Sequence, residues 1–409
     1  MPEEQTTAEQ QASQTQVPQQ INIESPKRSK KVLWILIALI ALVLVGVGIW
    51  LIVKKPPTEA SKEPAKQATS TAKPKEKETK PERTKFAYTD KGNIWVLDVV
   101  TKKKAQVTKD GSDEIYNSQP IFFDENSFTH LKCKSEKCEL WRVDFSGETF
   151  TTEQIKKFGG LIRSYDVDSK LKTLIYLAGE ETLADQGSEI NRLHLFKFDT
   201  QKDKVIYETE VVARGGSSDD AIGTKISPNG SKILFVNTVK QTDQEIIVIL
   251  DSAGNKLATL SGKITGPVWK ADSNTFIYRD IEKGVFSYTV ETKKSEEISN
   301  ETDWSGLSVS VDGKYCAHNK EYKAGDSGVI ADSEVYLFDL VTKKATLMGD
   351  SLVYPVWVNS SFIVTSKLKK CAADNCVSPD MYTAEPLLVI INIGSGVSYQ
   401  VQTNDTPSY

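Results

Sequence analysis

The stretch TKISPNGSKILFV, residues 224–236, decides the fold. A short apolar run ends at Ile226, a polar turn follows over residues 227–230, and a second apolar run begins at Lys232. Two more strand-like runs come next, EIIVILD at 245–251 and KLATLSG at 256–262. Apolar runs separated by turns rich in Gly, Asn, Asp and Ser predict antiparallel hairpins. This segment therefore predicts one four-stranded sheet.

The same pattern recurs along the chain. Copies begin at Gln119, Arg163, Thr224, Gly266, Leu307 and Tyr354. Repeats of four short strands every forty or so residues, without a helical period, are typical of β-propeller blades. Residues 86–108 supply a second, third and fourth strand but no first. We predict an all-β propeller over residues 86–409 with seven four-stranded blades, in which residues 404–409 complete the first blade; six blades is the alternative.

The turn Ser227-Pro228-Asn229-Gly230, followed by KILFV, resembles the SPDG turn of TolB-like, WD-like propeller repeats. Asp312-Gly313 and the prolines Pro120, Pro267 and Pro355 are weaker copies of the same motif. The resemblance covers most of residues 86–409. It implies the propeller fold, and propellers of this type serve in protein complexes or as lids on serine peptidases.

Residues 32–53, VLWILIALIALVLVGVGIWLIV, are uncharged and predict a transmembrane helix. At about 1.5 Å per residue this run spans a hydrocarbon core of about 30 Å. The alternatives are a signal peptide, which has a shorter apolar region nearer the start, and a core helix, which has a polar face. Residues 1–31 predict a disordered cytoplasmic tail, and residues 54–85, rich in Pro, Lys and Glu, predict a semi-extended stalk. The bilayer is thus one expected partner, through the 32–53 helix.

Five cysteines bear on the compartment, and four of them form close pairs: Cys133 with Cys138, and Cys371 with Cys376. We predict two local disulfides, which form outside the cytoplasm; a metal site built from both pairs is the alternative. Cys316 lies in a strand-like run and predicts a buried free thiol. Lysines flank both ends of the apolar run, so charge alone barely orients it. The disulfides favour a cytoplasmic N-terminus and a propeller outside the cell membrane.

Charge and motifs limit the function. Residues 86–409 hold 37 basic and 46 acidic side chains, which argues against a nucleic-acid partner. No G-x-S-x-G elbow, phosphate loop or dinucleotide fingerprint occurs, so no catalytic residue, metal ligand or cofactor is predicted. The histidines His130, His194 and His318 fall in separate blades, where packing roles are expected. Trp95, Trp141, Trp269 and Trp357 are expected to pack between blades.

The connections between second and third strands are long in several repeats, and both cysteine pairs fall among them. Long loops on a rigid scaffold commonly carry recognition; length drift without function is the alternative. We therefore predict a membrane-tethered, non-enzymatic interaction or scaffold module that binds a protein, peptide or glycan on this loop-rich face. The alternative is a glycan-active hydrolase or lyase at the cell surface, which requires carboxylates and tyrosines facing the central axis.

Overall fold

The structure is a computed structural model that describes residues 82–403, apart from residues 136, 147–148, 161, 169, 181–187, 213–222, 239–244, 324–329 and 371–381. Cys371, Cys376 and the predicted closing strand 404–409 lie outside the described residues, as do the 32–53 run and the stalk up to residue 81. Within the part of the chain that is described, no helix is long and apolar enough to cross a membrane.

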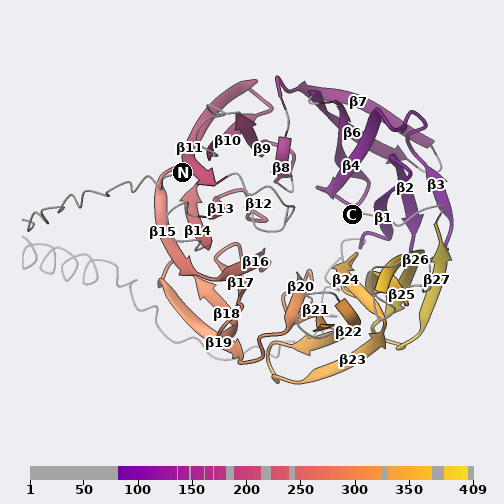
Figure 1. The fold of residues 1–409 in the computed structure, drawn as a ribbon. Helices are drawn as coiled ribbons and strands as arrows, with labels where there is room; N and C mark the ends of the chain where they lie inside the picture. Colours follow the sequence, from indigo (N-terminus) through magenta and orange to yellow (C-terminus); the bar gives the residue numbers. More distant parts are fainter. Residues whose placement is uncertain are drawn as a thin grey trace, which may run out of the picture. The chain divides into compact units, whose positions relative to one another are not determined.

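The described part forms seven antiparallel sheets arranged in a ring, so the prediction of seven blades is confirmed and the alternative of six is wrong (Figure 1). Blade 1 has three strands, β1 (Lys85–Asp90), β2 (Asn93–Asp98) and β3 (Lys104–Gln106). Blade 2 consists of β4 (Ile115–Phe122), β5 (Ser127–Lys134), β6 (Lys137–Ser146) and β7 (Thr149–Lys157). Blade 3 consists of β8 (Ile162–Val167), β9 (Thr173–Glu180), β10 (Ser188–Lys197) and β11 (Lys202–Val212). Blade 4 consists of β12 (Gly223–Ile226), β13 (Lys232–Thr238), β14 (Glu245–Asp251) and β15 (Lys256–Gly262). Blades 5 to 7 repeat this order: β16 (Ile264–Trp269), β17 (Thr275–Asp280), β18 (Gly284–Thr289) and β19 (Lys294–Ser299); β20 (Trp304–Val309), β21 (Tyr315–Lys323), β22 (Ile330–Asp339) and β23 (Ala345–Asp350); β24 (Leu352–Trp357), β25 (Phe362–Lys370), β26 (Tyr382–Asn392) and β27 (Ser398–Gln402).

The repeated turn owes its shape to one serine. Ser227 Oγ donates a hydrogen bond to Asn229 Oδ1 (3.0 Å) and accepts one from the main-chain N–H of Lys232 (2.9 Å). In blade 6, Ser310 Oγ makes the same pair of bonds with Asp312 Oδ1 (2.7 Å) and the N–H of Tyr315 (2.9 Å). A short polar side chain thus satisfies the turn's main-chain groups locally. This explains why the motif recurs in distant parts of the chain.

The core lies between blades. Each neighbouring pair of blades shares a hydrophobic cluster; Leu131 and Leu140 of blade 2, for example, join Leu174 of blade 3. The inner strands add hydrogen bonds. Trp269 Nε1 donates to the carbonyl of Lys225 in blade 4 (3.2 Å), and Trp357 Nε1 to that of Ser308 in blade 6 (3.0 Å). Both tryptophans are buried, and Trp95 packs against the cluster shared by blades 1 and 7, so the prediction is confirmed for these three. Trp141 is half-buried, and its Nε1 donates to Glu139 of its own strand (3.0 Å), so packing between blades is not seen for it. Cys316 is a buried free cysteine, also as predicted, and burial raises the pKa of its thiol to about 12.

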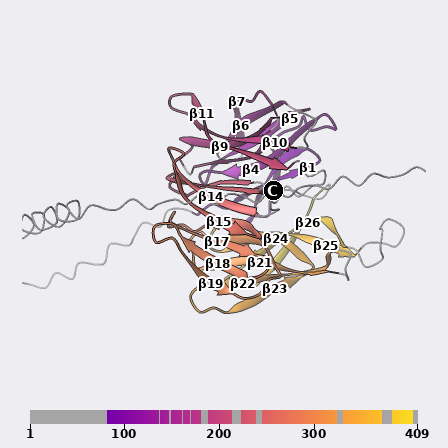
Figure 2. The same ribbon diagram turned by 60° about the vertical axis from the view of Figure 1, so that its left-hand side comes forward.

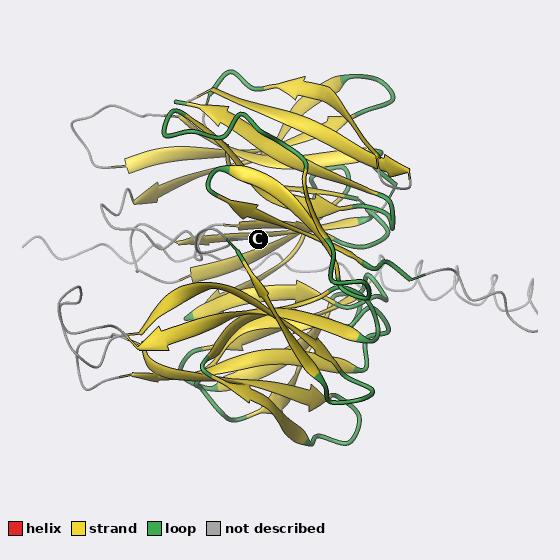
Figure 3. Cartoon of the chain, turned by 90° about the vertical axis from the view of Figure 1, so that its right-hand side faces the viewer, coloured by secondary structure: helices red, strands yellow, loops and turns green. Residues whose placement is uncertain are grey.

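The strand order separates two faces of the ring. Because neighbouring strands are antiparallel, the turns after each first and third strand lie on one face. We call this the short-turn face. The connections after each second strand, and those between blades, lie on the opposite, long-loop face. Figures 2 and 3 show the blades from the side, with described short turns gathered at one end of the strands.

The chain enters the propeller on the short-turn face. β1 occupies the place of a second strand, so its first residue, Lys85, lies at the same end of the sheets as the short turns. The preceding residues confirm this placement. Arg83 donates hydrogen bonds to the carbonyls of Trp357 (3.1 Å) and Val358 (3.0 Å), at the first turn of blade 7. Asn359 Nδ2 donates in return to the carbonyl of Arg83 (2.6 Å).

Candidate functional site

The long-loop face carries a stapled hairpin in blade 2. Cys133 on β5 and Cys138 on β6 are facing partners in the ladder, with Cα atoms 4.1 Å apart, and a disulfide joins them. The expected long loop is absent at this point, because β5 continues to Lys134 and β6 already begins at Lys137. The residues predicted as a loop instead extend the sheet as a short arm.

This arm is tied to the connection that enters blade 2. Lys132 forms an ion pair with Asp110, and Asn117 Nδ2 donates to Asp110 Oδ1 (3.2 Å) and to the carbonyl of Gly92 (2.9 Å). Burial raises the pKa of Asp110, but its bonds with Lys132 and Asn117 outweigh burial and lower it overall. A disulfide at one end and a charged network at the other hold the hairpin in a fixed position on the face.

The long connections of blades 3, 4, 6 and 7 lie outside the described residues at 181–187, 239–244, 324–329 and 371–381. The strands that lead to them are described, and those of blades 3, 6 and 7 continue well into the predicted loops. β21, for example, reaches Lys323 and β22 begins at Ile330. In blades 3, 6 and 7 the described strands therefore extend further into these connections than the sequence suggested.

A pocket of about 420 Å³ lies between blades 2 and 3, lined by Lys156, Phe158, Tyr176, His194 and Asp203. Asp203 accepts hydrogen bonds from Lys156 Nζ (2.8 Å) and from the hydroxyl of Tyr176 (2.5 Å). Its second oxygen is 3.2 Å from His194 Nδ1. The rings of Tyr176 and His194 are stacked with centroids 4.6 Å apart. Three polar groups, one from blade 2 and two from blade 3, thus converge on one carboxylate.

The electrostatics of this cluster follow from that convergence. Burial raises the pKa of Asp203, but the bonds from Lys156, Tyr176 and His194 outweigh it and lower the pKa overall, so Asp203 stays ionised. Burial and the nearby carboxylate raise the pKa of Tyr176, which keeps its proton. When His194 donates Nδ1–H to Asp203, its Nε2 is an acceptor.

The cluster offers groups for binding but no hydroxyl or thiol nucleophile of the serine-hydrolase or cysteine-hydrolase kind. No Ser, Thr or Cys is among the residues that line the pocket, so the Asp203–His194 pair has no nucleophile to activate. Its aromatic rings can pack against a ligand, and its ion pair can form hydrogen bonds with one. Such a lining suits a polar ligand such as a sugar or a peptide. Sequence reasoning missed this group, because Lys156 and Asp203 are 47 residues apart and meet only across two blades.

The other two histidines are core residues, as expected. His130 and His318 are almost fully buried, and burial lowers their pKa values to about 4 and about 3, so both are neutral at physiological pH. The His318 ring stacks on Trp304, with centroids 3.6 Å apart. In the described ranges, no group of three or more His, Cys, Asp and Glu side chains is placed to hold a metal ion.

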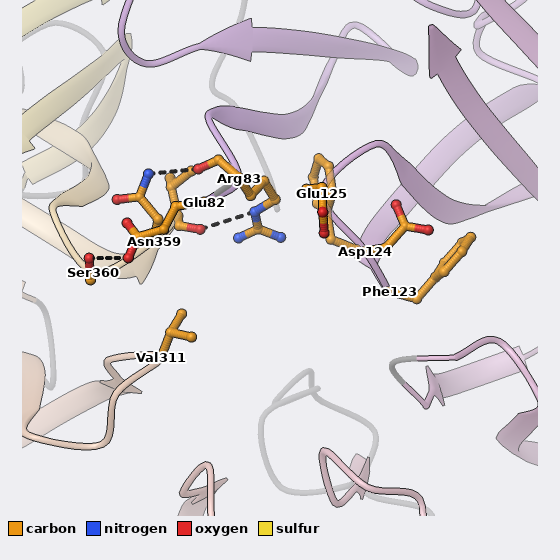
Figure 4. A pocket seen from close by; sticks show the side chains of 10 residues that line it. Glu82, Arg83, Phe123, Asp124, Glu125, Val311, Asn359 and Ser360 are labelled. Atoms are coloured by element: carbon orange, nitrogen blue, oxygen red, sulfur yellow. Dashed lines mark hydrogen bonds between the residues drawn. The ribbon is translucent and has the colours of Figure 1, made fainter. Parts of the chain in front are cut away.

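A second pocket, of about 530 Å³, lies on the short-turn face where the chain enters (Figure 4). Arg83 lies between Glu82 and Asn359 on one side and Asp124 and Glu125 on the other. Its guanidinium stacks over the Phe122 ring at 4.2 Å and bonds to two carbonyls of blade 7. Burial lowers the pKa of Arg83 to about 10, so it remains charged. These contacts join blades 1, 2 and 7, which gives this pocket a structural role.

Comparison with known proteins shows a likeness in fold. The sequence matches the family described as the dipeptidyl peptidase IV (DPP IV) N-terminal region over residues 55–152, a minor part of the chain. No curated protein sequence matches it. The tricorn protease superposes with a TM-score of 0.54 at 13% identity, covering 80% of this chain and 34% of that one. An oligogalacturonate lyase in complex with manganese gives 0.51 at 12% identity, covering 80% and 85%. TolB from Acinetobacter baumannii gives 0.45 at 13% identity, covering 77% and 76%.

The tricorn protease and the oligogalacturonate lyase share the fold of the chain over most of its length. This confirms the fold that the SPDG-like turn implied. The chain spans only about a third of the tricorn protease. At such identities the activities in these names do not transfer, and they include both a protease and a lyase.

Proposed function

We propose that this protein is a membrane-tethered, extracytoplasmic propeller that acts as a non-enzymatic interaction module. One observation carries the proposal: the chain enters on the short-turn face, where Arg83 is bound to blade 7. A tether at residues 32–53 then leaves the opposite face, with its stapled hairpin, directed away from the bilayer. A rigid, disulfide-closed arm on an exposed face suits recognition of a protein, peptide or glycan.

The tether is tested first. The full chain should stay with membranes after alkaline carbonate washing, and protease added to intact cells should cleave within residues 54–81 and release the propeller. Extraction by carbonate, or protection of the propeller in intact cells, would contradict the tether or its orientation. Thiol mapping adds a check: with an impermeant reagent and no reductant, Cys133 and Cys138 should not react.

The binding face is tested by site-specific photocrosslinking in cells. A photoreactive phenylalanine at Lys137, exposed on the long-loop face, should form a discrete adduct with a partner. The matched probe at Val341, which is 78% exposed on the short-turn face, should not form that adduct. Equal adducts from both positions, or from neither, would refute recognition by the long-loop face.

A glycan-active enzyme is the second candidate, and the pocket of Lys156, Tyr176, His194 and Asp203 favours it. Its histidine offers a proton acceptor, Nε2, beside a cationic lysine that suits an acidic sugar. The enzyme hypothesis also expects carboxylates and tyrosines that face the central axis. The side chains exposed on the described inner strands include Arg163, Lys225 and Tyr354 but no carboxylate, which gives the hypothesis less support. Release of sugar from a surface polymer by the purified chain, abolished by His194→Gln, would establish the enzyme.

A further inference from the structure

The turns between third and fourth strands, at the outer rim of the short-turn face, are rich in lysine. After the last residue of the third strand, and including the first residue of the fourth, the described turns hold two acidic residues, Asp199 and Glu291, and three more carboxylates, Asp98, Asp251 and Asp339, end the third strands directly before a turn. The basic residues are Lys102, Lys103, Lys104, Lys202, Lys256, Lys293, Lys294, Lys343 and Lys344. This excess opposes the net negative charge of residues 86–409. The charge of the propeller is therefore polarised, with cations gathered at this rim.

Three of these lysines have an unusual backbone conformation. Lys102, Lys293 and Lys343 have φ values of 62°, 53° and 58°, a left-handed conformation that favours glycine. In blades 4 and 7 glycines do occupy this position, Gly254 and Gly396. Three blades thus keep a lysine where the turn itself prefers glycine. Blade 3 has Gln201 at this position with a φ of 54°, so the turn itself does not require lysine, and the charge of these lysines can act outside the turn.

The carboxylates that end the third strands, directly before these turns, are used differently from the lysines. Asp339 Oδ1 accepts the main-chain N–H groups of Val341 (2.8 Å) and Thr342 (2.9 Å), and these bonds lower the pKa of Asp339. Asp98 accepts two such bonds in blade 1. The lysines Lys103, Lys202, Lys256, Lys293, Lys294, Lys343 and Lys344 form no side-chain ion pair or hydrogen bond with any described residue. These carboxylates are therefore bonded to main-chain N–H groups of the turns, whereas the ammonium groups of the seven lysines are available to an external partner.

We propose that the short-turn face docks on an anionic lipid bilayer through this rim of lysines. The fourth strands stand at the outer edge of the ring (Figure 1), so the lysines of blades 1, 3, 4, 5 and 6 are spread along the rim instead of converging on one point. Such an arrangement fits an extended flat surface better than a small anion. Lysines within a Debye length of anionic headgroups are attracted to them additively. The inference rests on the proposed tether, whose attachment on this same face would hold the rim near the bilayer.

The test uses the full chain reconstituted in nanodiscs. A donor dye on a cysteine introduced at Ser395, in the exposed blade 7 turn of this face, reports transfer to an acceptor on the lipid headgroups. We expect high transfer on discs with anionic lipid, low transfer on neutral discs, and loss of the difference in high salt. The variant Lys293→Gln/Lys294→Gln/Lys343→Gln/Lys344→Gln should weaken docking about tenfold or more. The matched variant Lys91→Gln/Lys109→Gln/Lys137→Gln/Lys157→Gln, which removes four exposed lysines from the long-loop face, should dock normally.

The outcomes separate the two proposals. A chain that fails to integrate into nanodiscs overturns the tether, and this inference with it. A chain that integrates but gives equal transfer on anionic and neutral discs overturns the docking surface alone. Equal loss in both lysine variants would show a general charge effect and also overturn it. Stronger competition by soluble polyphosphate than by anionic vesicles would assign the lysines to a polymer instead of the bilayer.

Discussion

At the scale of single residues, Asp203 supplies the carboxylate of the pocket between blades 2 and 3. It accepts hydrogen bonds from a lysine, a tyrosine and a histidine, and its side chain is 31% exposed. Asp203→Asn keeps the size but removes the charge that pairs with Lys156. We expect the free energy of unfolding at pH 7 to fall by about 2 kcal/mol, measured by urea denaturation.

The same variant predicts a pH dependence. The pKa of Asp203 is lowered in the folded protein, so its stabilisation is complete above the unfolded pKa, near 4, and is lost as the pH falls through the folded value. The gap in unfolding free energy between wild type and Asp203→Asn should therefore shrink below about pH 4. Asp199→Asn, an exposed neighbour without a charged partner among the described residues, is the control and should track wild type. A gap that stays constant with pH would contradict the network.

At the scale of elements, the inner strands carry a repeated bulge. The ladders of blades 2, 5, 6 and 7 shift register near the middle of the inner strand. At each shift one residue has positive φ: Gln119, Gly266, Gly306 or Tyr354. A bulge bends a strand and increases its local twist. The glycines of blades 5 and 6 satisfy this geometry without strain, whereas the side chains of blades 2 and 7 are held in it.

The two glycines allow a matched test. A Cβ at Gly266 would meet no atom within 4 Å, whereas a Cβ at Gly306 would lie against Oδ1 of the buried Asn319. Both have similar φ values, 61° and 56°, so the backbone cost of alanine is shared, about 1 kcal/mol. Gly306→Ala should destabilise the protein by about 1–2 kcal/mol more than Gly266→Ala, because Asn319, held by Ser305 at 2.5 Å, must move. Equal thermal unfolding of the two variants would contradict this.

Strands and turns could be predicted from the sequence where the residues that determine them lie close together in the chain. The serine at Ser227 and its copy at Ser310 set turns through bonds within six residues, so the blades could be counted from their motif. The missing first strand of blade 1 was equally visible. The ends of β5 and β21, up to Lys134 and Lys323, were not predictable, because polar residues on an extended arm resemble a loop. The group around Asp203 also escaped, since its members meet through the stacking of two sheets.

At the scale of the whole molecule, closure of the ring depends on how blade 1 meets blade 7. A hydrophobic cluster joins Phe86 and Tyr88 to Leu388 and Ile390. At the outer strands, Lys102 lies over the Tyr399 ring (3.1 Å) and Lys104 Nζ donates to the carbonyl of Gln402 (2.7 Å). The described part of blade 1 lacks a first strand, so the segment before β1 contributes to closure from the short-turn face.

Arg83 is the side chain that tests this closure. Its guanidinium donates to two carbonyls of blade 7 and stacks on Phe122 of blade 2, so one residue links three blades. Arg83→Met keeps much of the apolar contact but removes both hydrogen bonds, and we expect a loss of about 2 kcal/mol in unfolding free energy. Arg83→Lys should recover less than half of it, because a single ammonium cannot reproduce the fork. Lys103→Met, on the same face, is the control and should change stability by less than about 0.5 kcal/mol. If Arg83→Met unfolded like Lys103→Met in urea, closure would rest on the hydrophobic cluster and the outer strands, and the segment before β1 would be no part of the ring.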